Sequence, residues 1–168
     1  DPAYGVTQSL IDLGAGDDNL NITSVGESFT FGGFGNNNFT GAYGIVDSVI
    51  YSGDGDDSIA INVSSKASGF SDFWNFQDIE IGLGVAEAVG IDRSLLSTGS
   101  GNDNIIINSH SFGSNTNSWA VRNSTIFTGS GNDNVFLSAS DRAVSVGQVW
   151  DPAYGVTQSL IDLGAGDD

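Results

Sequence analysis

The sequence predicts an all-β fold, a right-handed parallel β-helix or β-solenoid with about four coils in each 150-residue repeat. Three observations support this prediction. The first eighteen residues, DPAYGVTQSLIDLGAGDD, return unchanged at 151–168. A shorter motif recurs four times inside that period, and in every copy aliphatic residues alternate on both sides of a Gly-x-Gly turn. Self-similarity at a fixed period is typical of architectures in which each unit packs on the next.

The duplication divides the chain into one full solenoid repeat, 1–150, and the start of the next identical repeat, 151–168. We expect the chain to be a window from a longer tandem array, or from a filament whose units join head to tail. The partners of each repeat are then neighbouring identical repeats stacked end to end, in the same chain or in a filament neighbour. This organisation predicts a structural or adhesive role.

The shorter motif has copies at 3–22, 42–61, 88–107 and 118–137, and its serine recurs at intervals of 39, 46, 30 and 35 residues. These intervals predict coils of unequal length with three short strands each. One strand precedes the turn, one follows it, and one lies in the variable segment, as in 28–40 and 73–82. A two-sided roll with about 18 residues per coil is the rival geometry, and it fits these intervals poorly.

Aliphatic residues two positions apart follow each turn, and this spacing places both on one face of a strand. Gly-x-Gly supplies a tight bend with positive φ. Stacked coils also align the serines, and they align Tyr4, Tyr43, Val89 and Trp119 in a second column; we expect both columns to be structural. The residues predicted to point inward are Leu20, Ile22, Ile59, Ile61, Ile105, Ile107, Val135 and Leu137 after the turns, and Ile11, Ile50, Leu96 and Ile126 before them.

The chain is strongly acidic, with 21 acidic and 4 basic residues and a formal net charge of −17. Such a chain repels nucleic acid and anionic membranes and attracts divalent cations. Cysteine is absent, which excludes disulfides, thiolate zinc sites and a thiol nucleophile. No apolar run approaches the length of a membrane span. We therefore expect no nucleic-acid partner and no membrane insertion.

The Gly-rich turns GAGDDNLN (14–21), GDGDDSIA (53–60), GSGNDNII (99–106) and GSGNDNVF (129–136) resemble the nonapeptide GGxGxDxUx of the RTX (repeats-in-toxin) calcium-binding family. The resemblance implies Ca²⁺ bound between coils of a secreted bacterial protein, with turn glycine carbonyls completing an oxygen shell. Two departures are the replacement of the first Gly by Leu13, Ser52, Thr98 or Thr128, and turn intervals of 30–46 residues in place of nine. Carried over by position, the metal ligands are Asp17, Asp18, Asp56, Asp57, Asn102, Asp103, Asn132, Asp133, Asp167 and Asp168.

Repulsion between stacked carboxylates is expected at the same turns. Stacked coils place Asp above Asp at about the strand spacing of ~4.8 Å. Like charges at that range raise carboxylate pKa values and destabilise the fold unless a cation intervenes. The alternative is an Asn/Asp ladder held by side-chain-to-backbone hydrogen bonds without any metal.

No catalytic motif accompanies the turns. The one histidine, His110, lies in SHSFGSN, and we expect it to be a loop residue. Because no nucleophile motif accompanies it, we predict that the chain is not an enzyme. We expect a structural subunit of a secreted bacterial cell-surface fibre, sheath or adhesin, stabilised by calcium. The alternative is a carbohydrate-binding or carbohydrate-modifying β-helix that contacts surface glycans, and a third possibility is a translocation module of an RTX toxin. The sugar-binding alternative would use the aromatic residues Phe70, Phe73, Trp74 and Phe76, flanked by Asp72, Asp78 and Glu80.

Overall fold

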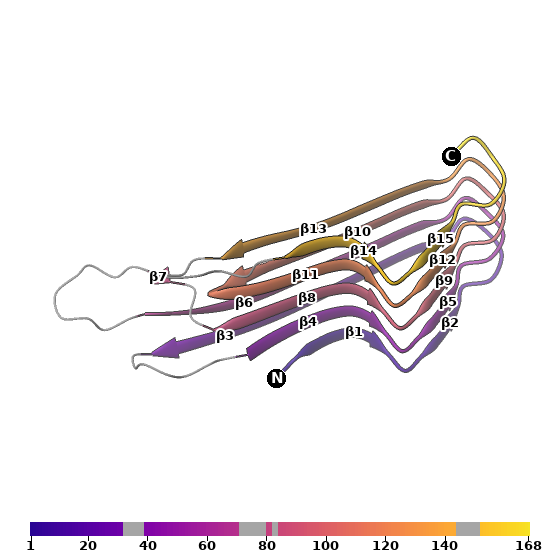
Figure 1. Ribbon diagram of the computed structural model, residues 1–168. Helices are drawn as coiled ribbons and strands as arrows, with labels where there is room; N and C mark the ends of the chain where they lie inside the picture. The colour runs from indigo at the N-terminus through magenta and orange to yellow at the C-terminus, as the bar shows by residue number, and fades with distance from the viewer. Residues whose placement is uncertain (32–38, 71–79, 82–83, 144–151) are drawn as a thin grey trace.

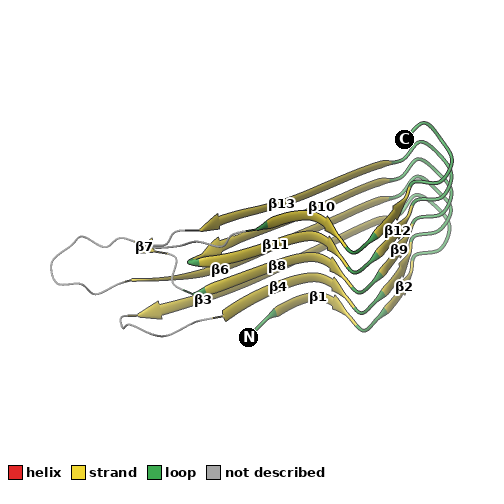
Figure 2. Cartoon of the chain, viewed as in Figure 1, coloured by secondary structure: helices red, strands yellow, loops and turns green. Residues whose placement is uncertain are grey.

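A computed structural model describes residues 1–31, 39–70, 80–81, 84–143 and 152–168. These ranges contain strands and turns, and no helix, so the all-β prediction is confirmed (Figure 2). The strands lie in layers, one coil above the next from the N-terminal to the C-terminal end (Figure 1). The fold is a parallel β-solenoid.

Three sheets run along the solenoid. Each of the first four coils contributes a strand to every sheet, and residues 153–168 contribute strands to the first and third sheets. The first sheet has the order β1 (Ala3–Thr7), β4 (Phe39–Val46), β8 (Val85–Asp92), β11 (Asn115–Arg122) and β14 (Ala153–Thr157). The second has the order β13 (Asn134–Ala143), β10 (Asn104–Gly113), β6 (Ser58–Phe70) and β3 (Asn19–Phe31), and β7 (Glu80–Ile81) pairs antiparallel with β6. The third has the order β15 (Leu160–Asp162), β12 (Thr125–Phe127), β9 (Leu95–Ser97), β5 (Val49–Tyr51) and β2 (Leu10–Asp12).

The strand register follows the sequence motif. Ala3 pairs with Ala42, Ala42 with Ala88, Ala88 with Ser118, and Ser118 with Ala153. Equivalent serines in successive coils are 39, 46, 30 and 35 residues apart and are hydrogen-bonded to each other. The unequal coils predicted from the motif are therefore present, and the two-sided roll is excluded.

The strands of a coil are distributed differently from the prediction. Two strands precede the Gly-x-Gly turn, because the residue before each motif serine has a positive φ and turns the chain between them. These corner residues, with φ between 47° and 50°, are Gln8, Asp47, Arg93, Asn123 and Gln158. The third strand is the long one after the turn. The predicted variable-segment strands fall largely outside the described residues, which exclude 32–38 and 71–79.

The core fills the space between the three sheets. The inward positions predicted from the two-residue spacing are buried in the middle coils, where Ile61, Ile105 and Ile107 are at most 1% exposed. Their equivalents in the end coils, such as Leu20 and Leu137, are partly buried against the same core. Full burial of an Ile side chain contributes about 1.5–3 kcal/mol. Stacking therefore buries each coil's apolar face more completely than one coil could alone.

The predicted apolar column is also present. The rings of Tyr4 and Tyr43 stack with centroids 5.1 Å apart, and those of Trp119 and Tyr154 with centroids 5.9 Å apart. Val89, between the two pairs in register, is fully buried. Burial and the carboxylate of Glu87 raise the pKa of Tyr43 to about 12.

Candidate functional site

The acidic turns stack in register at one edge of the solenoid. Parallel bridges connect Ala15 to Asp54, Asp54 to Ser100, Ser100 to Ser130, and Ser130 to Ala165. The turns approach each other so closely that a side chain at Gly99 (φ +96°) would place its Cβ 2.0 Å from the carbonyl oxygen of Gly53. Glycine is therefore required both by its φ and by the coil above or below it.

The second acidic position of each turn forms an inner row, defined as Asp18, Asp57, Asp103, Asp133 and Asp168. Beyond the first coil, each Oδ1 atom accepts a hydrogen bond from the backbone N–H of the equivalent Asp in the preceding coil. The N···O distances are 2.9 Å from Asp18 to Asp57, 3.0 Å from Asp57 to Asp103, 2.9 Å from Asp103 to Asp133, and 2.9 Å from Asp133 to Asp168.

The first acidic position forms an outer row, defined as Asp17, Asp56, Asn102, Asn132 and Asp167. Here the hydrogen bonds run the other way, because in the first four coils each Oδ1 accepts from the backbone N–H of the following coil. The distances are 3.0 Å from the Asp56 N–H to Asp17, 2.7 Å from Asn102 to Asp56, 3.0 Å from Asn132 to Asn102, and 2.9 Å from Asp167 to Asn132. The structure thus brings all ten predicted ligand residues together in two adjacent rows.

The inner row has one carboxylate oxygen per coil left over. The Oδ2 atoms of Asp18, Asp57, Asp103 and Asp133 are buried and have no hydrogen-bond partner. Burial raises the pKa of Asp103, and the neighbouring charges of Asp133 and Asp57 raise it further. The Thr98 hydroxyl and the Asp57 N–H act in the opposite direction and lower this pKa, but the net shift is upward. A line of buried, unpaired carboxylate oxygens is unfavourable unless protons or cations neutralise it.

The structure shows the hydrogen-bonded ladder that the metal-free interpretation predicts. Within the described ranges, no three His, Asp or Glu side chains form a group that could hold a metal ion. Two turn carbonyls that could complete an oxygen shell, those of Gly99 and Gly129, accept hydrogen bonds from the N–H groups of Ser130 and Ala165 at 3.0 Å. The calcium site therefore stays a prediction. The inner Oδ2 oxygens, which have no hydrogen-bond partner, are the atoms that a cation could still bind.

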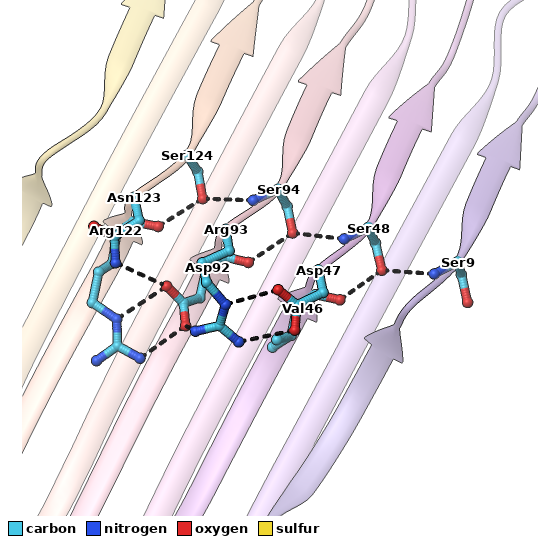
Figure 3. A network of polar contacts seen from close by, with 10 residues as sticks. All are labelled: Ser9, Val46, Asp47, Ser48, Asp92, Arg93, Ser94, Arg122, Asn123 and Ser124. Atoms are coloured by element: carbon cyan, nitrogen blue, oxygen red, sulfur yellow. Dashed lines mark hydrogen bonds and ion pairs between the residues drawn. The ribbon is translucent and has the colours of Figure 1, made fainter.

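The motif serines form a third row, at the corner between the first and third sheets (Figure 3). The hydroxyl of Ser94 donates to the Asp92 carbonyl at 2.7 Å and accepts the Ser48 N–H at 3.1 Å. The same pair of bonds recurs at Ser48 and Ser124. Each hydroxyl therefore closes its own corner and also joins it to the preceding coil, which confirms the structural role expected for this column.

A charged network beside the serines was not predicted from the sequence. The Asp92 carboxylate is 1% exposed and contacts Arg93 and Arg122, with Arg122 Nη2 2.9 Å from Asp92 Oδ2. Arg122 Nη1 also reaches Glu87 at 2.9 Å. Arg93 forms two hydrogen bonds with Asp47, at 2.7 and 2.9 Å, and they lower the pKa of the exposed Asp47 carboxyl (Figure 3). Motif alignment could have revealed the network, since Arg122 occupies the motif position of Asp92 one coil later.

A hollow of about 560 Å³ lies over this corner. Its polar lining includes Arg93, Asp47 and Asn123, and Val49 and Leu95 supply apolar surface. The Arg93 guanidinium is already engaged by Asp47 and Asp92. The hollow therefore has little unpaired charge to offer a ligand.

Of two other sequence predictions, one is wrong and one concerns residues whose side chains are not described. His110 is not a loop residue, because it lies within β10, where its exposed ring contacts Ser140 Oγ at 3.0 Å through Nδ1. Continuous pairing with β6 and β13 makes the segment a strand. The side chains proposed for sugar binding, from Phe70 to Glu80, lie outside the residues whose side chains are described.

Comparison with protein-family models, with curated proteins and with solved structures finds no match to this chain. The resemblance to RTX repeats therefore depends on the motif residues alone. Among the described residues, no helix has the length and hydrophobicity needed to cross a membrane.

Proposed function

We propose that this chain is a structural unit of a secreted bacterial cell-surface fibre, sheath or adhesin, in which repeats stack end to end. One observation carries the proposal. Residues 153–168, identical to 3–18, stack on the fourth coil through the same strand pairing that joins the coils within the repeat. The contact between consecutive repeats thus continues the contact between consecutive coils.

The proposed function is mechanical. Backbone hydrogen bonds in three sheets run along the axis, and the serine, inner and outer rows add three more lines of bonds in the same direction. Pulling two coils apart requires these bonds to break together. A rod of this construction suits a stalk or fibre.

Calcium stabilisation is part of the proposal. The inner Oδ2 atoms are hard oxygen donors of the kind that Ca²⁺ prefers, and they are buried without partners. The strand spacing of about 4.8 Å is roughly twice a calcium–oxygen distance. We assign the cation to the inner row, with Asp57 and Asp103 as its central residues; when bound, it would neutralise charge that otherwise opposes stacking.

Thermal melting with calcium and with EDTA tests this assignment. At a free calcium concentration 100 times its Kd, one site stabilises the folded chain by about 2.7 kcal/mol. We expect EDTA to lower the Tm by about 5–10 °C at that stability change. An unchanged Tm would leave the metal-free ladder as the correct interpretation.

Asp103→Asn localises the effect. The substitution keeps an oxygen for the Asp57 N–H but removes the buried charge, so it should reduce the difference between the calcium and EDTA melting temperatures. Asp12→Asn is the matched control, since Asp12 is an exposed residue of β2 that belongs to neither acidic row. A calcium response that is equal in the two variants would contradict the inner-row assignment.

Immunogold labelling of intact source cells with an antibody to this chain tests the location. We expect label along filaments or a sheath outside the cell. Label confined to the cell interior would contradict the proposed function, whatever the result with calcium.

A further inference from the structure

Two tyrosines from successive coils form a stacked pair on the outer face of the first sheet. Strands β1 and β4 lie side by side, and Tyr4 of β1 is opposite Tyr43 of β4 in the register (Figure 1). The two ring centroids are 5.1 Å apart, and the rings are inclined by 17°. Stacking of the coils therefore places two phenols next to each other, although 39 residues separate them in the sequence.

The pair is open to reagents in solution. Tyr4 is 50% exposed, and Tyr154, at the same motif position one repeat later, is 44% exposed although its ring stacks on Trp119. Tyr43 is half-buried, and its ring lies over Gly41, where a Cβ would be 2.7 Å from Tyr43 Cε2. Glycine at this position thus leaves room for the Tyr43 ring.

An oxidant that attacks this chain meets no sulfur side chain, because cysteine and methionine are both absent. There are four tyrosines, and three of them belong to the column of the first sheet. The fourth, Tyr51, is an exposed residue of β5 whose register neighbours are Asp12 and Ser97. Oxidised Tyr51 therefore has no tyrosine beside it in its column, whereas oxidised Tyr4 has one.

We propose that Tyr4 and Tyr43 are a site of oxidative cross-linking, at which a one-electron oxidant such as a haem peroxidase with hydrogen peroxide joins the two rings as dityrosine. Each phenol gives one electron to the oxidant and releases its proton, and the peroxide is reduced to water. The two phenoxyl radicals form one carbon–carbon bond between ring positions ortho to the oxygens. The hydrogens on those carbons move to the oxygens, so the product keeps both hydroxyl groups and has two hydrogen atoms fewer than the pair.

The surroundings of Tyr43 supply an acceptor for its proton. Burial raises the pKa of Tyr43 to about 12, and the nearby carboxylate of Glu87 contributes to the rise, so the hydroxyl is protonated at neutral pH. The same hydroxyl donates a hydrogen bond to Glu87, which can take the proton as the electron leaves. Arg122 fixes Glu87 through the 2.9 Å contact between Nη1 and Oε1. The exposed Tyr4 releases its proton to water.

Proximity favours coupling within the pair over other fates of the radicals. Groups held next to each other react far faster than groups that must meet in solution. Rotation about the Cβ–Cγ bond is broad for tyrosine, so the two ortho carbons can turn toward each other. The resulting bond joins the first coil to the second covalently, so the two coils stay connected when the rod is pulled.

Oxidation of the dilute purified chain by a haem peroxidase and hydrogen peroxide is the test, read by dityrosine fluorescence and mass spectrometry. Isolation of the monomer afterwards removes links between copies. Cleavage before each Asp then separates Tyr4, Tyr43 and Tyr51 into the peptides 1–11, 18–46 and 47–53. We expect a product that links 1–11 to 18–46, with two hydrogen atoms fewer than the two peptides together. A monomer that carries its link on 47–53 would overturn the proposal.

Single substitutions separate the pair from the other tyrosines. Tyr43→Phe keeps a ring in the stack but removes the phenol, and it should lower the dityrosine fluorescence of the monomer roughly tenfold. Tyr51→Phe is the matched control, since Tyr51 is 42% exposed, and the fluorescence should stay that of the unmodified chain. Residues 151–161 are identical to 1–11, so Tyr154→Phe checks which copy is linked, and the link should persist. Equal losses in Tyr43→Phe and either of the other two variants would contradict the assignment.

Denaturation distinguishes the folded geometry from chance encounters. A ruthenium photo-oxidant with persulfate replaces the peroxidase, because it remains active in urea. In the unfolded chain the two phenols are joined only by a flexible loop, with an effective concentration on the order of millimolar. We expect the yield of the 1–11 to 18–46 link to fall roughly fivefold in urea, given the loss of proximity. Equal yields from the folded and unfolded chains would show that the stacked pair has no part in the reaction.

These outcomes are separable from those of the proposed function. Cross-linking is measured on the purified chain and depends neither on where the protein resides nor on a calcium response. A chain that labels surface fibres but forms no link between Tyr4 and Tyr43 would retain the proposed function and lose this inference.

Discussion

Replacement of one motif serine measures how strongly a corner joins neighbouring coils. Ser94 is 8% exposed, and its Oγ makes two hydrogen bonds, one to the Asp92 carbonyl and one from the Ser48 N–H. In Ser94→Ala the buried Ser48 N–H loses its partner, which costs about 1–3 kcal/mol, and loss of the bond to the carbonyl adds about 1 kcal/mol. We expect a total of about 3 kcal/mol, or a Tm lower by about 6–12 °C for a chain of this size.

Ser9→Ala is the matched control. Ser9 occupies the same motif position but is exposed, and its described Oγ contact is the 2.7 Å bond to the Thr7 carbonyl. We expect a cost below about 1 kcal/mol. Thermal melting and urea denaturation of the two variants should be measured side by side. If Ser94→Ala were no more destabilised than Ser9→Ala, the serine row would not couple the coils.

Two further predictions concern charge. Arg122→Met should destabilise the chain by about 3 kcal/mol, because it removes a partner of the buried Asp92 carboxylate, whereas Arg93→Met, at a 51% exposed side chain, should cost less; urea denaturation compares them. In EDTA, the Tm should rise as the pH is lowered from neutrality toward the unfolded pKa of Asp, because the raised pKa of Asp103 lets the folded chain bind a proton before the unfolded chain does. This gain ends near the unfolded pKa of about 3.9. A Tm that falls over the same interval in EDTA would show that the inner row does not repel itself.

The stacking register could be predicted from the sequence because the motif repeats it. Leu96 and Ile126 lie at the same motif position, and they pair in the structure. Alternation of apolar residues then determines which face is buried, since a shift of one residue would turn Ile105 and Ile107 outward. The sequence therefore predicts both the register and the core of the described coils.

The corner between the two strands before the turn was harder to predict. Positive φ is usually a property of glycine, but the corner residues include Gln8 and Arg93. The signal lies in the next residue, because the serine hydroxyl donates to the carbonyl two residues before it and so closes the corner, and it also accepts an N–H from the preceding coil. A local pattern could not show the second bond, since its partner is 46 residues away.

The charged network was missed for a related reason. Arg93 and Arg122 are 29 residues apart and resemble isolated surface cations in the sequence. Stacking places Arg122 beside Asp92, and Arg93 beside Asp47, in adjacent coils. Charges in a solenoid are therefore best compared by motif position, not by distance along the chain.

The composition of the two acidic rows favours the calcium proposal over the metal-free ladder. In the outer row, Asn102 and Asn132 accept a backbone N–H through their amide oxygens as well as Asp17 and Asp56 do. A ladder that needs only one acceptor oxygen per coil therefore does not need a carboxylate. Yet the inner position is Asp in every copy of the motif, at the site where burial makes a charge most costly. A cation held by the second carboxylate oxygen explains this difference, and if Asp103→Asn simply stabilised the chain with and without calcium, that explanation would be wrong.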